Sequence, residues 1–323
     1  MLKARVVRQS MNERVLVTGG AGFIGSAILR ELHKLTYEIF VIDNLSQGKR
    51  EHAPIGDESF FQIDILDFDS VANCARAISP TWVMHLAGIH FIPYCNSHPF
   101  ESSSINLQGT VNVLDALRGV DSVRRVFFAS TAAVYADSAT TVSEMSPTVP
   151  LDIYGLTKFV GERLVNEFHC ATGVPCIIGR LFNAYGPRET NAHLVPEILR
   201  QVLEGRRRIE LGNVTTRRDY IHTSDMVRAI TKLMVMHRDG VDAFNIGSGH
   251  SHTAREIVEY FERAVNYSLE ITIADSRVRK QDRAVLQANT EKIRQATGWS
   301  PLISFQEGIN ALVQGESLVS DSG

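Results

Sequence analysis

The hydrophobic residues in the first 180 positions gather in short runs, and amphipathic segments separate these runs. The runs predict six strands, at 14–19, 39–44, 60–65, 82–88, 125–130 and 176–182. Helices are predicted near 23–34, 69–78, 101–118 and 153–171. The strands are too apolar to be buried on one face only, so we expect a parallel sheet with helices on both faces. This is the doubly wound α/β architecture of a Rossmann fold.

The pattern changes after Asn183, where the predicted elements become shorter and more mixed. Helices are expected near 194–204, 223–237, 253–265 and 304–313. A smaller mixed α/β domain that binds the substrate is therefore predicted over 183–219 and 251–323. Residues 1–182, joined by a returning segment at about 220–250, form the predicted Rossmann domain.

Composition agrees with a two-domain protein of 323 residues, because 44% hydrophobic and 21% charged residues allow a sizeable core. A net charge of −3 gives no electrostatic reason to expect nucleic acid or a membrane surface as partner. Residues 1–13 are polar and basic, unlike a targeting signal, and no apolar run reaches the length of about 18 residues that a membrane span needs. The four cysteines form no CxxC pair, so we expect free thiols, no metal site and a cytoplasmic location.

The motif TGGAGFIG at 18–25 directly follows the apolar run 15–17 and precedes a predicted helix. In that context Gly19 allows a tight turn, Gly22 allows close approach of a pyrophosphate, and Gly25 allows the helix to pack on the strand. A flexible glycine-rich turn is the alternative explanation. The position of Asp43, about 20 residues further on at a strand end, instead favours a dinucleotide site.

Asp43 also bears on the choice of dinucleotide. A carboxylate at this position accepts hydrogen bonds from ribose hydroxyls and repels a 2′-phosphate, so NAD is expected rather than NADP. Lys49 and Arg50 lie nearby in the sequence and could serve a phosphate, but in a Gln-Gly-Lys-Arg turn we expect them to be solvated side chains instead.

Tyr154 and Lys158 are separated by one turn at the start of a predicted helix, so the two side chains share a face. A phenol with a pKa of about 10 is a poor base at neutral pH. A neighbouring ammonium and a positively charged nicotinamide ring favour the phenolate. The pair is common by chance, and the dinucleotide motif upstream makes it a candidate acid/base site.

With these motifs the chain resembles the extended short-chain dehydrogenase/reductases that modify nucleotide-diphosphate sugars, and its pattern is most similar to UDP-glucose 4-epimerase-like members. The resemblance covers nearly the whole sequence. Besides the motifs above, it rests on Asp64-Ile65, DNLSQG at 43–48, HLAG at 85–88, INLQGT at 105–110, FASTAAVY at 128–135, YGLTK at 154–158, RLFNAYGPR at 180–188, RRDYIH at 217–222, FNIGSG at 244–249 and GWSP at 298–301.

The resemblance implies a role for individual residues. Tyr154 is the expected base, Lys158 its electrostatic partner and ribose ligand, and Thr131 the hydroxyl that shuttles a proton to the sugar. Residues expected to bind NAD are Gly19, Gly22, Phe23, Ile24, Gly25, Asp43, Asn44, Asp64, Ile65, Leu86, Ala87, Gly88, Ser130, Tyr154 and Lys158, with Asn106 as a structural or cofactor neighbour. Residues expected to bind the nucleotide sugar are Thr131, Asn183, Leu194, Arg218 and Arg279.

Two of these roles have simpler alternatives, and a third rests on a weaker match to the family. Asn183 could be a turn residue and Arg218 an exposed charge, although their motifs favour a function. At Arg279 the chain departs from the family, since Lys280-Gln281 replaces the usual Pro-Gly. If the arginines do bind the diphosphate, their planar guanidinium groups suit that task.

Two small residues decide which reaction the resemblance implies. Dehydratase members carry Asp-Glu after the residue that matches Thr131, and decarboxylase members carry a glutamate where Ala133 stands. Here the pair is Ala132-Ala133, which favours inversion at carbon 4, because oxidation and reduction at one carbon need no further acid or base. A dehydratase, decarboxylase or reductase is the enzymatic alternative, and an NAD-sensing scaffold without catalysis is the other.

Three further points concern a loop, two histidines and the assembly. The loop 90–99 is bulkier than the family pattern, and it either selects a sugar substituent or packs over the cofactor. His85 and His90 are expected to be strand-end or pocket-wall residues rather than bases. The resemblance also implies a homodimer that pairs the helices at 101–118 and 153–171, although Val111, Leu114 and Leu117 could equally cover the sheet.

Overall fold

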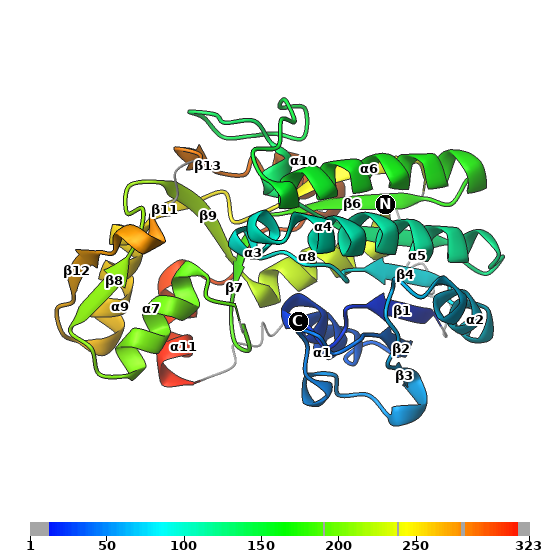
Figure 1. Cartoon of the computed structure of the whole chain (residues 1–323), viewed down its shortest axis with the longest axis horizontal. Helices are drawn as coiled ribbons and strands as arrows, with labels where there is room; N and C mark the ends of the chain where they lie inside the picture. The colour runs from blue at the N-terminus through cyan, green and yellow to red at the C-terminus, as the bar shows by residue number, and fades with distance from the viewer. Residues whose placement is uncertain (1–12, 190, 238, 279–281, 316–323) are drawn as a thin grey trace, which may run out of the picture.

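The computed structural model describes residues 13–189, 191–237, 239–278 and 282–315. Its main feature is a parallel sheet of seven strands in the order β10-β6-β5-β4-β1-β2-β3 (Figure 1). These strands are β1 (Arg14–Thr18), β2 (Glu38–Ile42), β3 (Phe60–Phe61), β4 (Trp82–His85), β5 (Arg125–Thr131), β6 (Cys176–Leu181) and β10 (Val241–Ile246). The doubly wound α/β prediction is confirmed.

Helices cover both faces of this sheet, as the apolar strands require. They are α1 (Phe23–Leu32), α2 (Phe68–Ile78), α5 (Gly109–Arg118), α6 (Ile153–Thr172), α8 (Thr223–Met236) and α10 (Glu291–Thr297). Core residues of α1, α8 and α10 cluster on one face, and those of α2, α5 and α6 cluster on the other. β4 and β5 are buried along their full length between these two layers.

Between β4 and α5 the chain passes through a segment that lies beside the site. It contains α3 (Ile92–Ser97), α4 (Pro99–Ser103) and one π-helical turn at Ser104–Gln108 directly before α5. The helix predicted over 101–118 is therefore continuous but not uniformly α-helical. π-helical turns of this kind are frequently found at functional sites.

The remaining elements form a smaller mixed part, seen on the left of Figure 1. β9 (Arg217–His222) is its central strand and pairs with β7 (Asn183–Tyr185), β11 (Ser251–Thr253) and β13 (Val285–Leu286), while β8 (Arg208–Leu211) pairs with β12 (Glu270–Ile273). Helices α7 (Leu194–Leu203), α9 (Ala254–Val265) and α11 (Phe305–Gln314) pack around them. Capping boxes begin α9 at Thr253 and α11 at Ser304.

Two details differ from the sequence-based expectations. The strand expected over 60–65 ends at Phe61, because Ile63 donates its amide to the Phe61 carbonyl and the chain turns there. A seventh strand, β10, was not expected as a separate strand. It pairs with β6 at the edge of the sheet, and the first half of its residues are only partly buried, so its apolar signal is weak.

Within the described ranges, no helix combines the length and apolar character needed to cross a membrane.

Candidate active site

A cavity of about 1080 Å³ lies at the carboxyl ends of the central strands and extends to the smaller part of the molecule. Parallel α/β sheets bind ligands at this edge. The residues expected to bind cofactor or substrate line this one cavity, with one exception. They are Gly19, Gly22, Phe23, Ile24, Gly25, Asp43, Asn44, Asp64, Ile65, Leu86, Ala87, Gly88, Ser130, Thr131, Tyr154, Lys158, Asn183, Leu194 and Arg218. The exception, Arg279, lies outside the described residues.

The glycine motif forms the turn between β1 and α1. Gly19 has a φ of +74°, and a Cβ there would lie 2.7 Å from the Ala87 amide nitrogen. A Cβ on Gly25 would lie 2.1 Å from the Gly19 carbonyl oxygen, so the helix can approach the turn only without a side chain. α1 starts after Gly22 with no side-chain cap and no acidic residue in its first turn, a suitable end for a pyrophosphate.

Asp43 lies at the end of β2 and is held by backbone groups of two loops. Its Oδ2 accepts from the Ala21 amide at 2.9 Å, and its Oδ1 accepts from the Leu45 amide at 2.8 Å. Burial raises the pKa of this carboxyl, and both hydrogen bonds oppose that rise. Arg50 instead donates to the Ala53 and Ile55 carbonyls and to Asp57. The competing use of Arg50 for a 2′-phosphate therefore has no support in its contacts.

The three expected catalytic residues come from two adjacent elements. Thr131 ends β5, where its Oγ1 accepts from the Ala133 amide at 3.1 Å. Tyr154 and Lys158 lie on the first two turns of α6, which Asp152 caps by accepting from the Gly155 amide at 2.7 Å. The Thr131 hydroxyl and the Tyr154 phenol line the same cavity, and the hydroxyl opposes the rise that burial causes in the pKa of the phenol. Lys158 is buried, and its ammonium lies 4.9 Å from the centre of the Phe128 ring.

The electrostatics of this pair differ from the simple expectation. Burial raises the pKa of the Tyr154 phenol, and the Thr131 hydroxyl only partly opposes the rise. Burial also lowers the pKa of Lys158 to about 8. Desolvation disfavours the charged form of each group, so the protein residues alone do not stabilise a phenolate. Stabilising the Tyr154 phenolate would therefore need the positive charge of a bound nicotinamide ring, which the sequence-based expectation also included.

Asn106, on the π-helical turn, connects the loop after β4 to α6. Its Oδ1 accepts from the Ile89 amide at 2.8 Å, and its Nδ2 donates to the Ile89 carbonyl at 2.9 Å and to the Thr157 hydroxyl at 3.1 Å. These contacts fix the wall of the cavity next to Lys158. Asn106 is therefore a structural neighbour of the site.

The two histidines differ in their surroundings. His85 ends β4 and is buried between the hydroxyls of Thr18, 2.7 Å from Nδ1, and Thr110, 3.0 Å from Nε2. His90 lies on the cavity wall, where its Nε2 is 3.1 Å from Nδ2 of Asn191. Burial lowers the pKa of each to about 3, so both are neutral at physiological pH.

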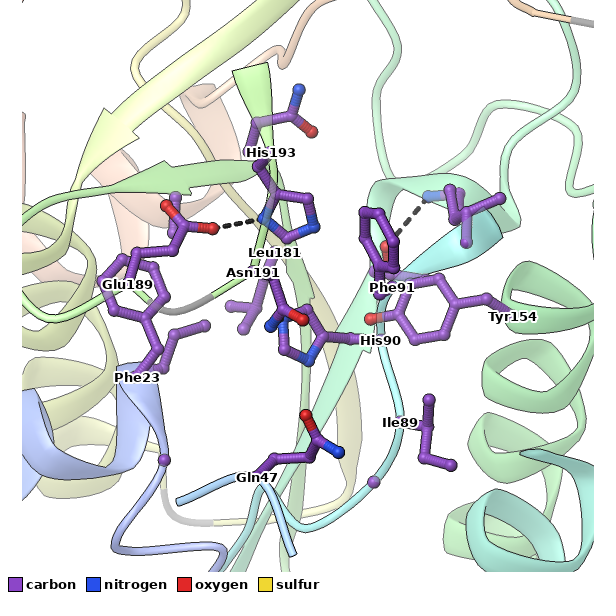
Figure 2. A pocket seen from close by; sticks show the side chains of 18 of the residues that line it. Phe23, Gln47, Ile89, His90, Phe91, Tyr154, Leu181, Glu189, Asn191 and His193 are labelled. Carbon is purple, nitrogen blue, oxygen red and sulfur yellow. Dashed lines mark hydrogen bonds and ion pairs between the residues drawn. The ribbon is translucent and has the colours of Figure 1, made fainter. Parts of the chain in front are cut away.

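A polar cluster on the wall was missed in the sequence (Figure 2). The buried Glu189 carboxylate pairs with Nδ1 of His193, whose ring centre is 5.5 Å from those of His90 and Phe91. Figure 2 shows Glu189 beside Phe23 and the Tyr154 phenol on the opposite side of the pocket. The available signal was the run of polar residues directly after RLFNAYGPR, which has no periodicity of its own.

The expected ligands of the diphosphate lie at the boundary with the smaller part. Arg218, on β9, donates to the Arg217 carbonyl at 2.7 Å and pairs with the Asp282 carboxylate. Asn183 begins β7, opposite Tyr220 of β9, and Leu194 begins α7. Each reaches the cavity from a different element, so a ligand that spans it contacts both parts of the molecule.

Comparisons with known proteins agree with this geometry. Residues 15–247 match the model of the NAD dependent epimerase/dehydratase family. UDP-glucose 4-epimerase of Streptomyces lividans is 33% identical over 311 residues, which are 90% of this chain and 92% of that protein.

Two solved structures are also similar over nearly their full length. UDP-glucose 4-epimerase of Thermus thermophilus in complex with NAD has a TM-score of 0.84 at 32% identity and covers 93% of this chain and 98% of its own. UDP-glucose 4-epimerase of Thermotoga maritima with UDP-glucose has a TM-score of 0.86 at 28% identity and covers 94% and 98%. The chain belongs to the NAD dependent epimerase/dehydratase family.

Proposed function

We propose that this protein is an NAD-dependent epimerase that inverts carbon 4 of a UDP-sugar through a transient 4-keto intermediate. The observation that carries the proposal is a cavity lined by both Thr131 and Tyr154, in which the residues after Thr131 are Ala132 and Ala133. This arrangement supplies one acid/base pair and no carboxylate at the two positions where loss of water or carbon dioxide would need one. The relatives named UDP-glucose 4-epimerase support the same reaction.

The side chains divide the work between them. Tyr154 removes the proton from the 4-hydroxyl of the sugar, and Thr131 holds that hydroxyl by hydrogen bonding. A bound NAD⁺ would supply the acceptor and donor of the hydride exchanged at carbon 4, and its positive charge would favour the phenolate of Tyr154. Lys158 holds the ribose and adds a second positive charge. Tyr154 then returns its proton to the new 4-hydroxyl, so the reaction has no net redox change.

The rest of the cavity is assigned to binding. The dinucleotide occupies the turn at Gly19–Gly25 and the acidic ends of the next strands, within a domain formed by 1–182 and about 220–250. Asn183, Leu194, Arg218 and Arg279 hold the nucleotide diphosphate, within a domain formed by 183–219 and 251–323. A firm grip on the diphosphate leaves the keto sugar free to turn over between the two hydride transfers. Arg218 exchanges its bond with Asp282 for the phosphate in this scheme.

We also infer a cytoplasmic homodimer in which copies meet through the outer faces of α5 and α6. Leu114 and Leu117 of α5 are buried against the sheet, so they do not contribute to such a contact. Val111 of α5 and Leu156 of α6 are 38% and 49% exposed and are available for it.

The decisive test incubates the purified protein with NAD and UDP-glucose or UDP-galactose and follows the products by NMR. We expect interconversion of the two sugars without net growth of absorbance at 340 nm. Loss of water would instead support the dehydratase alternative, and release of carbon dioxide from UDP-glucuronic acid in a parallel assay would support the decarboxylase. Net consumption of NADH with a keto-sugar nucleotide would support the reductase. A panel of uridine-, thymidine-, guanosine- and cytidine-diphosphate sugars then identifies the base and the sugar.

A further inference from the structure

We propose that Arg283 is a positioning residue that fixes the relative placement of Thr131 and Tyr154. The inference rests on the catalytic roles proposed for that pair. Arg283 lies two residues before β13 and follows Asp282, and its side chain is almost fully buried at 5% exposure. No sequence motif singles it out, and its guanidinium reaches two elements that are distant in the chain.

The first of these elements is the turn that follows Thr131. The guanidinium donates to the Ala133 carbonyl at 2.8 Å through Nη2, and to the Tyr135 carbonyl at 2.9 Å through Nη2 and 3.1 Å through Nε. The amide of the same Ala133 donates to the Thr131 hydroxyl. Arg283 therefore holds, through its carbonyl, the same residue whose amide bonds the Thr131 side chain.

The second element is the start of α6. Nη1 of Arg283 is 3.9 Å from Oδ2 of Asp152, the residue that caps this helix through its other carboxylate oxygen. A Cβ on Gly155 would lie 2.5 Å from the Ala133 carbonyl oxygen, so the first turn of α6 packs directly on the peptide that Arg283 holds. Tyr154 lies between the capping residue and this contact.

The chemistry of the contact explains why an arginine stands here. Burying a guanidinium is unfavourable unless its donors are satisfied, and here two carbonyls and one carboxylate surround it. Its planar fork has donors on two edges, so one side chain can bridge a turn and a helix cap. Burial lowers the pKa of Arg283, and the Asp152 carboxylate opposes that effect. An apolar residue of similar size would fill the space but would leave both carbonyls without this donor.

Arg283 also lines the cavity, so the alternative is a direct contact with substrate. The two roles separate in kinetics. A substrate ligand changes KM and the dissociation constant of UDP, whereas a positioning residue changes kcat, because a displacement of about 1 Å between reacting groups lowers the rate by about 10²-fold.

The experiment compares Arg283→Met and Arg283→Lys with Arg294→Met, a control on the exposed face of α10 whose guanidinium pairs with Glu291. We expect Arg283→Met to lower kcat by about 10- to 100-fold, with KM and the dissociation constant of UDP within about threefold of the wild type. Arg283→Lys should recover part of the loss, because an ammonium can still donate to one carbonyl. A crystal structure of Arg283→Met should show the 132–135 turn displaced from α6.

Unchanged kcat in Arg283→Met, or a rise in KM and in the UDP dissociation constant without a fall in kcat, would overturn the positioning role. An undisplaced turn in the crystal structure of Arg283→Met would also overturn the positioning role. A wild-type protein that is inactive on every nucleotide sugar would contradict the proposed function, and the crystal structure would still test the positioning role in that case. If Arg283→Met does not fold, Asp152→Asn takes its place, since asparagine still caps a helix but removes the charge that faces Arg283. It should lower kcat without changing KM, and an unchanged kcat would refute the proposal.

Discussion

The side-chain amide of Asn106 donates to the hydroxyl of Thr157, and this one bond joins the π-helical turn to the helix that carries the candidate catalytic pair. Asn106 also satisfies both backbone groups of Ile89. We expect Asn106→Ala to destabilise the protein by about 2 kcal/mol, because it leaves several polar groups without partners. Urea unfolding measures this. Asn166→Ala, which removes a bond within α6 only, should cost less than about 0.5 kcal/mol, and equal losses in the two variants would contradict the argument.

Asp43 should control the choice of dinucleotide. In Asp43→Asn the charge that repels a 2′-phosphate is lost, while one oxygen remains to accept from Ala21 or Leu45. We expect NAD to bind about tenfold more weakly and the preference for NAD over NADP to shrink. Calorimetric titration with both dinucleotides tests this. Asp57→Asn, at an exposed carboxylate paired with Arg50, is the control, and an unaltered NAD to NADP ratio in Asp43→Asn would count against the assignment.

Tyr154→Phe should remove the acid/base group and leave the cavity otherwise intact. We expect turnover to fall by at least about 10²-fold, the usual contribution of general acid–base catalysis, with NAD affinity nearly unchanged. Steady-state kinetics and NAD titration measure the two effects. Tyr94→Phe removes an exposed phenol bonded to Glu101 and should retain full activity. Full activity in Tyr154→Phe would exclude the proposed mechanism.

Lys158 links activity to stability. Its pKa is about 8 in the fold and about 10.4 in an unfolded chain, so the unfolded state binds more protons between these values and stability rises with pH there. Below pH 8 the burial penalty is fully present. Lys158→Met should therefore be inactive yet about 3 kcal/mol more stable than wild type at pH 7 in the cofactor-free protein.

Denaturant unfolding at pH 7 and pH 9.5 tests that linkage. The difference between Lys158→Met and wild type should shrink at the higher pH, because the wild-type lysine loses its proton in the folded state. A difference that stays constant with pH would show that packing, rather than charge burial, sets the stability of the variant.

Sequence patterns predicted the parts of the molecule that depend on local signals. Apolar runs such as 15–17 identify buried strands, and the glycines at 19, 22 and 25 identify a turn that only small residues permit. The described candidate residues that the family motifs identified line one cavity, even though they come from many elements.

The features that were not predicted depend on approaches between distant segments. His90 meets Asn191 across 101 positions, and Arg283 meets Ala133 across 150. Nothing in the local sequence around these four residues indicates which distant residue each one contacts. The raised pKa of Tyr154 was not predicted for a related reason. Burial of the phenol by segments that are distant in the sequence raises this pKa, and the nearby Lys158 does not offset the effect.

The position of β10 constrains how this protein can be divided. Because β10 covers the outer side of β6, a polypeptide that stops at residue 182 would expose the amides and carbonyls of Cys176–Leu181 as an unsatisfied edge. Such edges recruit other chains and cause aggregation. A fragment of residues 1–182 would therefore need β10 fused to it before it could be studied alone. Cutting the chain once, after residue 182, leaves the sheet without this strand.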